Sequence, residues 1–159
     1  MASNFVEKQA GKFAKIIDPK LPYIEIACLI IAIAAELTLE SNPEVSRITI
    51  LIVLSILSVL YYFNAFRIGE DIDNAFEKFY IKLFGFANAV SVLGILFFIN
   101  NYAGASIMTN VGMLSLIIAV FLVFGLKYFQ KINTVRRVDI IRAVVLLVLI
   151  GSFYISIKH

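Results

Sequence analysis

The sequence has no tryptophan, one cysteine (Cys28) and one histidine (His159). A single cysteine cannot form an internal disulfide, so cysteine usage does not indicate a redox compartment. Without a histidine before residue 159, a histidine-ligated haem, copper or zinc site among the apolar segments is excluded, and so is histidine acid–base catalysis. Nucleotide-binding, metalloprotease and serine-hydrolase motifs are also missing. The sequence therefore predicts no cofactor and no metal site, and it favours a protein that is not an enzyme.

Charge is scarce as well. Charged residues make up 16% of the chain and hydrophobic residues 61%, whereas soluble domains average about 25% and about 45–50%. A compact globule of this composition would lack the polar surface that keeps a protein dissolved. The excess apolar surface is expected to face lipid, and the absence of a long basic tract argues against a nucleic-acid partner.

Five apolar runs are long enough to cross a bilayer, for which about 20 residues of helix are needed. None of them alternates with period two, and an open sheet cannot satisfy its edges in lipid. Short connectors make consecutive helices antiparallel neighbours. The sequence thus predicts an all-α, multi-pass integral membrane protein, a five-helix transmembrane bundle within one domain (1–159), with spans at about 21–39, 48–66, 79–99, 107–129 and 139–157.

The basic residues predict the orientation of these spans. With the N-terminus in the cytoplasm, the positive-inside rule is obeyed by twelve of the fourteen Lys and Arg residues, and only Arg47 and Lys158 fall outside. The twelve are Lys8, Lys12, Lys15, Lys20, Arg67, Lys78, Lys82, Lys127, Lys131, Arg136, Arg137 and Arg142. We expect an integral membrane location, by default a bacterial inner membrane, with the N-terminus cytoplasmic and the C-terminus outside.

Residues 1–20 precede the first span and read as a cytoplasmic amphipathic segment. Apolar residues share one helical face (Val6, Ala10, Phe13 and Ile17), and lysines form a second stripe (Lys8, Lys12 and Lys15). Such a helix rests its apolar side in the membrane interface and its lysines against anionic headgroups. The predicted partners of this segment are therefore the bilayer and anionic lipid.

Two carboxylates lie inside the first predicted span. Glu25 and Glu36 are 11 residues apart, which is about 20° beyond three helical turns, so they share a face with Cys28. Because an ionised carboxylate in lipid is costly, this face is expected to point into the bundle or a water-filled cavity. Together with Asn88 and Asn110 on later spans, Glu25 and Glu36 are candidates for an ion or substrate path. The alternative is that each acid is simply paired or near an interface.

Other polar and small residues in the predicted spans suggest contacts between the helices. Polar residues on three later spans are expected to hydrogen-bond between helices: Ser55, Ser58, Asn88, Ser91, Asn110 and Ser115. Small residues suited to close helix contact recur in the later spans: Gly85, Gly94, Gly112, Ala119 and Gly151. Arg142 lies at i+3 from Asp139, which allows an intrahelical pair. Arg136, Arg137 and Arg142 are also candidates for contact with anionic lipid or ligand.

Three hypotheses for function follow. The leading one is a small integral membrane subunit that works through helix–helix association, in a homo-oligomer or with other membrane subunits. The second is a proton- or cation-coupled channel or transporter that uses Glu25 and Glu36. The third is a lipid-modifying intramembrane enzyme, which would depend on a divalent metal held by Asp71, Asp73 or Glu77.

Overall fold

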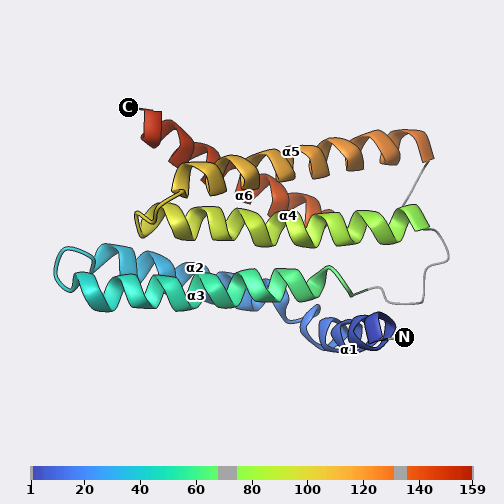
Figure 1. Cartoon of the computed structure of the whole chain (residues 1–159), viewed down its shortest axis with the longest axis horizontal. Helices are drawn as coiled ribbons and strands as arrows, with labels where there is room; N and C mark the ends of the chain where they lie inside the picture. The colour runs from blue at the N-terminus through green and yellow to red at the C-terminus, as the bar shows by residue number, and fades with distance from the viewer. Residues whose placement is uncertain (1, 68–74, 131–135, 159) are drawn as a thin grey trace.

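The computed structural model describes residues 2–67, 75–130 and 136–158. All secondary structure in these ranges is α-helical, with no strand (Figure 1). The helices are α1 (Ala2–Ile17), α2 (Leu21–Leu37), α3 (Pro43–Asn64), α4 (Ala75–Ile99), α5 (Ala105–Gln130) and α6 (Arg137–Lys158). Each predicted apolar run is therefore helical, and so is the segment before the first run.

Among the residues that the structure describes, three stretches are long and apolar enough to cross a membrane: α3, α4 and residues 105–125 of α5. At 17 residues, α2 is shorter than the roughly 20 that span the hydrocarbon core. The fold is all-helical and compatible with an integral membrane protein, whereas the count of five crossings and the interfacial position of α1 stay predictions.

Proline and turn residues set the helix boundaries. Pro22 and Pro43 lie in the first turns of α2 and α3, where a missing N–H costs no hydrogen bond. The turn between α4 and α5 contains Asn101 at φ 52° and Gly104 at φ 84°, a backbone region that asparagine and glycine tolerate best. These residues reverse the chain within a few positions and make neighbouring helices antiparallel.

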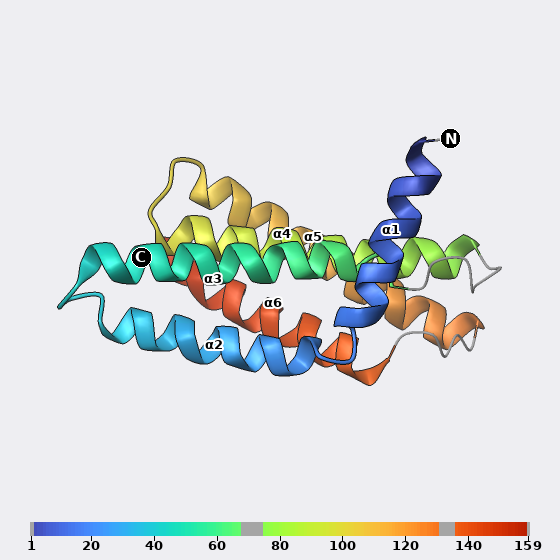
Figure 2. The same cartoon turned by 90° about the horizontal axis from the view of Figure 1, so that it is seen from below.

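The helices pack around α4. It contacts α3 on one side and α5 and α6 on the other, while α2 packs mainly on α3. Figure 2 shows α6 between α4 and α2, converging on α2 where both helices begin. The N-terminal helix α1 packs on α3, and it crosses the end of the bundle at a steep angle instead of joining it lengthwise.

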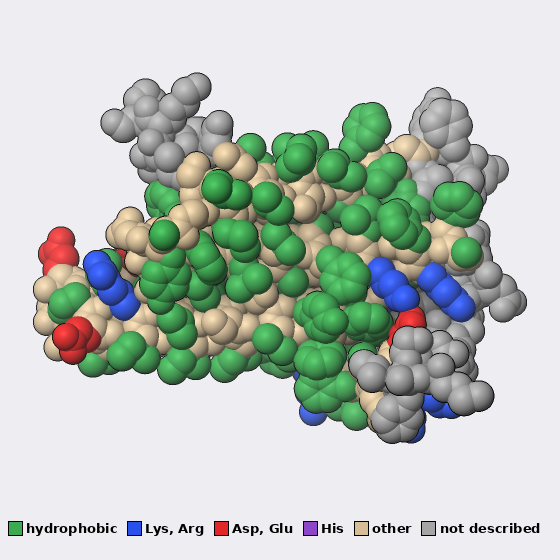
Figure 3. All heavy atoms as spheres, viewed as in Figure 1, with side chains coloured by type: hydrophobic (Ala, Val, Ile, Leu, Met, Phe, Trp, Pro, Cys, Tyr) green, Lys and Arg blue, Asp and Glu red, His purple; other side chains and the backbone are tan. Residues whose placement is uncertain are grey.

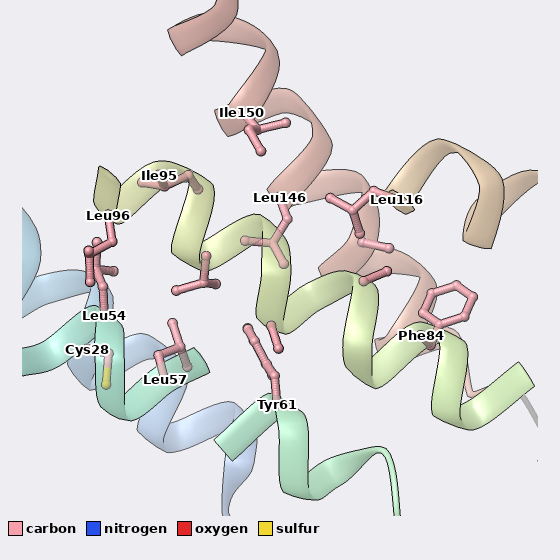
Figure 4. Packing of buried hydrophobic residues seen from close by; sticks show 14 of the residues in the cluster. Cys28, Leu54, Leu57, Tyr61, Phe84, Ile95, Leu96, Leu116, Leu146 and Ile150 are labelled. Atoms are coloured by element: carbon pink, nitrogen blue, oxygen red, sulfur yellow. The ribbon is translucent and has the colours of Figure 1, made fainter. Parts of the chain in front are cut away.

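The core is formed by the facing sides of α3, α4, α5 and α6. Leu57 and Tyr61 of α3, and Leu146 and Ile150 of α6, point toward α4 from opposite sides (Figure 4). These side chains are buried, and Leu116 of α5 joins them.

Small residues permit the closest helix contacts, as predicted for three glycines. A Cβ on Gly112 would lie 2.8 Å from the Cα of Ser91, and one on Gly94 would lie 3.0 Å from the carbonyl oxygen of Met108. A Cβ on Gly85 would lie 2.6 Å from the Cα of Ala65. For Gly151 the structure shows no such contact, since no atom of the described residues lies within 4 Å of an added Cβ.

Hydroxyl groups link the helices where the backbones approach. Ser58 of α3 donates to the carbonyl oxygen of Ala89 in α4 at 3.0 Å. The hydroxyl of Ser91 lies 2.7 Å from the carbonyl oxygen of Ala87 in its own helix and 3.0 Å from that of Gly112 in α5, and these two acceptors share its single proton. The expected interhelical hydrogen bond is confirmed for Ser58, whereas Ser115 donates to the carbonyl oxygen of Val111 within its own helix.

Hydrophobic side chains cover the middle of the outer surface. In the view of Figure 3 they form a broad band along the helices, and the charged side chains gather toward the two ends. Large hydrophobic side chains are exposed on α2, α3, α5 and α6 alike. Water would disfavour such a continuous apolar band, and the hydrocarbon core of a bilayer favours it.

Candidate functional site: an ion-pair network at one end of the bundle

Asp139, in the first turn of α6, lies at the centre of a network of charged side chains. Arg67, just beyond the end of α3, donates two hydrogen bonds to its carboxylate, at 2.8 Å to Oδ1 and 2.6 Å to Oδ2. Arg142 donates to Oδ1 at 3.1 Å, the intrahelical contact that the i+3 spacing allowed. Asp139 therefore joins the end of α3 to the start of α6.

Arg142 extends the network to α2. Its Nε forms an ion pair with Oε1 of Glu25. Its guanidinium carbon also lies 5.4 Å from the ring centroid of Tyr61 on α3, within the range of a cation–π contact. One arginine of α6 thus touches a carboxylate of α2 and an aromatic ring of α3.

Arg136 connects the same end of the bundle to the α1–α2 junction. It donates two hydrogen bonds to Asp18, at 2.7 and 2.6 Å, and its Nε lies 3.6 Å from Oδ2 of Asp139. The hydrogen bonds to the Asp18 carboxylate raise the pKa of Arg136 above its ordinary value. Asp18 also lies 3.9 Å from Arg67, which closes the network.

The six ionic groups balance in charge, with three carboxylates and three guanidinium groups: Asp18, Glu25, Asp139, Arg67, Arg136 and Arg142. At its centre the side chains of Arg67 and Asp139 are only 8% and 4% exposed, whereas Arg136 at the rim is 44% exposed. Removing one partner of a buried pair leaves an uncompensated charge, which costs several kcal/mol. The network therefore fixes which helix ends meet.

The expectation that Glu36 faces the bundle interior is wrong for the single chain, because its side chain is exposed in the last turn of α2. The buried positions of α2 are Leu21, Cys28 and Ala35, which repeat every seven residues. At 100° per residue, a residue seven positions later lies about 20° short of two full turns, whereas a residue eleven positions later lies about 20° past three full turns. The buried positions and the two glutamates therefore move in opposite directions around the helix axis. Glu25 therefore lies about 40° from the buried stripe at Leu21, and Glu36 lies about 100° from it at Ala35.

The two predicted asparagines occupy different environments. Asn88 of α4 is 2% exposed, and its Oδ1 is buried without a hydrogen-bond partner. Asn110 is exposed near the start of α5. Of the four path candidates, Asn88 is therefore buried, Glu25 is half-buried, and Glu36 and Asn110 are exposed, while a path that they share stays a prediction.

The residues predicted to contact anionic lipid also differ in exposure. Lys8, Lys12 and Lys15 are exposed on α1, and Arg136 and Arg137 are exposed at the start of α6. Arg142 is buried and paired with Glu25 and Asp139, and contact of this side chain with anionic lipid or ligand stays a prediction.

Sequence reasoning missed Asp18 and Arg67 as site residues. Arg67 entered only as one positive charge among twelve, and Asp18 only as an unnamed part of the amphipathic segment 1–20. A signal was present in the charge distribution, because Asp18, Glu25 and Asp139 lie near helix ends on the side where the basic residues gather. Acids on a strongly basic side are candidates for pairing.

Of the three acids in the enzyme hypothesis, only Glu77 belongs to the described residues. Asp71 and Asp73 fall outside the described residues, and Glu77 is in the first turn of α4. Within the described ranges, no group of three or more His, Cys, Asp or Glu side chains is placed to hold a metal ion.

No protein-family model, curated protein or solved structure matches the chain. Functional inference therefore depends on the geometry of these helices.

Proposed function

We propose that this protein is a small integral membrane subunit that acts through association of its helices, with other copies or with other membrane proteins. In this proposal α2 to α6 cross the bilayer five times, and α1 lies in the cytoplasmic interface. The proposal depends on one observation. The charged groups around Glu25 pair with one another at one end of the bundle, and the long faces left uncovered are apolar.

The ion-pair network supports a structural role for Glu25. Three carboxylates and three guanidinium groups neutralise one another, so Arg142 and Glu25 do not present a net charge to a solute. Such a network specifies which helix ends meet and holds α2 and α6 together where they converge. With the ends fixed, the outer surface of the bundle is defined well enough to recognise another helix.

The interfacial position of α1 is supported by its contacts. Phe13 packs edge-on against Phe63 of α3 with ring centroids 5.0 Å apart, and Glu7 pairs with Lys82 of α4 at 2.5 Å. Lys8 and Lys12 are exposed at the end of the bundle where the other basic residues lie. In this proposal these two lysines contact anionic headgroups of the cytoplasmic leaflet.

A direct test is the assembly state of the full chain in lipid. The protein carrying one fluorophore is reconstituted into vesicles at decreasing protein-to-lipid ratio, and bleaching steps are counted. In parallel, it is extracted from its native membrane into lipid nanodiscs and its mass is measured. We expect more than one copy per particle, or a complex of fixed composition. A monomer in both experiments would overturn the proposal.

A proton- or cation-coupled pathway is the second candidate, favoured by the buried amide oxygens of Asn64 and Asn88, which lack a hydrogen-bond partner. Carbonyl oxygens in such positions are suitable ligands for water or a cation. Ion flux into vesicles separates the two functions. Flux that is lost in Glu25→Gln while the protein remains folded would favour the pathway, and Glu36→Gln serves as the matched control on the same helix.

A further inference from the structure

The outer side of α5 has an unusual order of residues. Six positions spaced alternately by three and four residues are exposed: Ile107, Asn110, Leu114, Ile117, Phe121 and Phe124. Their apolar members are between 44% (Ile117) and 77% (Phe121) exposed. This is the a/d spacing of a heptad repeat, which keeps one face of a helix toward a partner helix.

The opposite side of α5 packs against other helices of the same chain. Thr109, Gly112, Leu116, Ala119 and Val123 are buried and have the same alternating spacing. Leu114 and Leu116 are two residues apart, which places them on roughly opposite faces of the helix. In Figure 1, α4 lies below α5, and beyond the start of α5, which the C-terminal part of α6 passes, no helix lies on its upper side. The outer stripe is therefore a second packing face that nothing in the described chain covers.

Asn110 distinguishes this stripe from an ordinary lipid-facing surface. Its amide makes no side-chain hydrogen bond within the described part of the chain. It lies between the exposed Ile107 and Leu114, in a stretch apolar enough to span a membrane. By contrast, the exposed stripe along the middle of α3 is wholly apolar, with Ile48, Ile52, Ile56 and Val59. Lipid can cover the α3 stripe but cannot satisfy the Asn110 amide.

We infer that the outer stripe of α5 binds the same stripe of a second copy of this chain, with Asn110 of each copy hydrogen-bonded to Asn110 of the other. This inference rests on the proposed association function and names its surface and its partner. A side-chain amide carries both a donor and an acceptor, so two amides complement each other. Copies inserted with the same topology place Asn110 at the same depth, and a two-fold axis along the membrane normal brings equivalent residues together.

The stripe has the features of a membrane helix pair with one polar position. In a heptad interface, a single asparagine fixes register and the number of helices. In lipid, asparagine also stabilises helix association by interhelical hydrogen bonds. The bulky side chains of Leu114, Ile117, Phe121 and Phe124 supply the remaining contact, with the crossing angle of about +20° usual for such pairs.

Cysteine cross-linking in membranes tests the face. Cys28 is the only cysteine, so Cys28→Ser gives a background for single replacements. In that background, Leu114→Cys should form a disulfide-linked dimer on mild oxidation. Ile52→Cys, on the exposed stripe of α3 and similarly exposed, is the matched control and should remain monomeric. Equal cross-linking at Ile52 and Leu114 would overturn the inference.

The role of the amide is tested by dilution of the protein in lipid vesicles. Asn110→Leu, which replaces an exposed side chain by one of similar size, should raise the dimer dissociation constant about tenfold. Asn110→Gln keeps the amide and should largely preserve dimers. A Leu variant that dimerises as tightly as the unmodified protein would also overturn the inference.

The outcomes separate this inference from the proposed function. Assembly through another face, or a complex with another protein that ignores changes at Asn110 and Leu114, removes only the inference and leaves the proposed function standing. A chain that is monomeric in vesicles and in its native membrane removes both.

Discussion

Arg67 and Asp139 are 72 residues apart in the sequence and form a two-pronged ion pair, with N–O distances of 2.8 and 2.6 Å. The pair joins the end of α3 to the first turn of α6, and both side chains are almost fully buried. Since the geometry matches the planar fork of arginine, lysine is not an equivalent replacement.

Loss of this pair is expected to destabilise the protein. Arg67→Gln should lower the free energy of unfolding by about 3 kcal/mol, because Asp139 keeps only its weaker contacts with Arg136 and Arg142. Arg67→Lys keeps the positive charge that orients the chain but loses the fork, and should cost about 1–2 kcal/mol. The measurement is denaturant unfolding in lipid bicelles. Arg47→Gln, exposed at the opposite end of α3, is the control, and an equal effect there would contradict the prediction.

The two carboxylates of α2 should respond differently to substitution. Glu25→Gln removes the α2 partner of buried Arg142 and should cost about 2 kcal/mol of stability. Glu36→Gln changes an exposed side chain and should stay within about 0.5 kcal/mol. Thermal unfolding of both variants in the same detergent is the measurement. Similar melting temperatures for the two variants would show that the network does not hold α2 in place.

Glycines 112 and 125 of α5 form a matched pair for helix packing. Gly112→Ala places a methyl group 2.8 Å from the Cα of Ser91, so α4 and α5 must separate. Overpacking of this kind costs about 1–3 kcal/mol. Gly125 has open space around it, and Gly125→Ala should be neutral or stabilising by up to about 1 kcal/mol, the difference in helix propensity. Unfolding measurements decide, and a Gly112→Ala protein as stable as the unmodified one would contradict the close contact.

Five crossings give a definite labelling pattern. In the Cys28→Ser background, Ala103→Cys lies in the exposed turn between α4 and α5, and Lys20→Cys lies between α1 and α2. A maleimide that cannot cross membranes should label Ala103→Cys in intact cells, and Lys20→Cys only after the cells are opened. Labelling of both positions from the same side would rule out the proposed arrangement.

Much of the fold could be predicted from the sequence because the helices are specified locally. Continuous apolar runs of about 20 residues predict helices, and Pro43 and Gly104 mark where they begin or turn. Residues at the predicted helix contacts were also partly foreseeable, since Gly112 and Ser91 are small or able to bond across a close contact. These features depend on residues only a few positions apart, whose relationship the sequence shows directly.

The sequence alone determined an all-helical chain whose apolar surface suits a membrane and whose basic residues favour one side. Only the tertiary structure decided that Glu25 pairs with Arg142, that Arg67 reaches Asp139, and that Glu36 lies outside the bundle. The physical reason is that ion pairing depends on how helices distant in the sequence converge and rotate about their axes. The half-buried Glu25 and the exposed Glu36 differ in how far helix rotation carries each from the buried stripe of α2, and a list of apolar runs does not show that rotation.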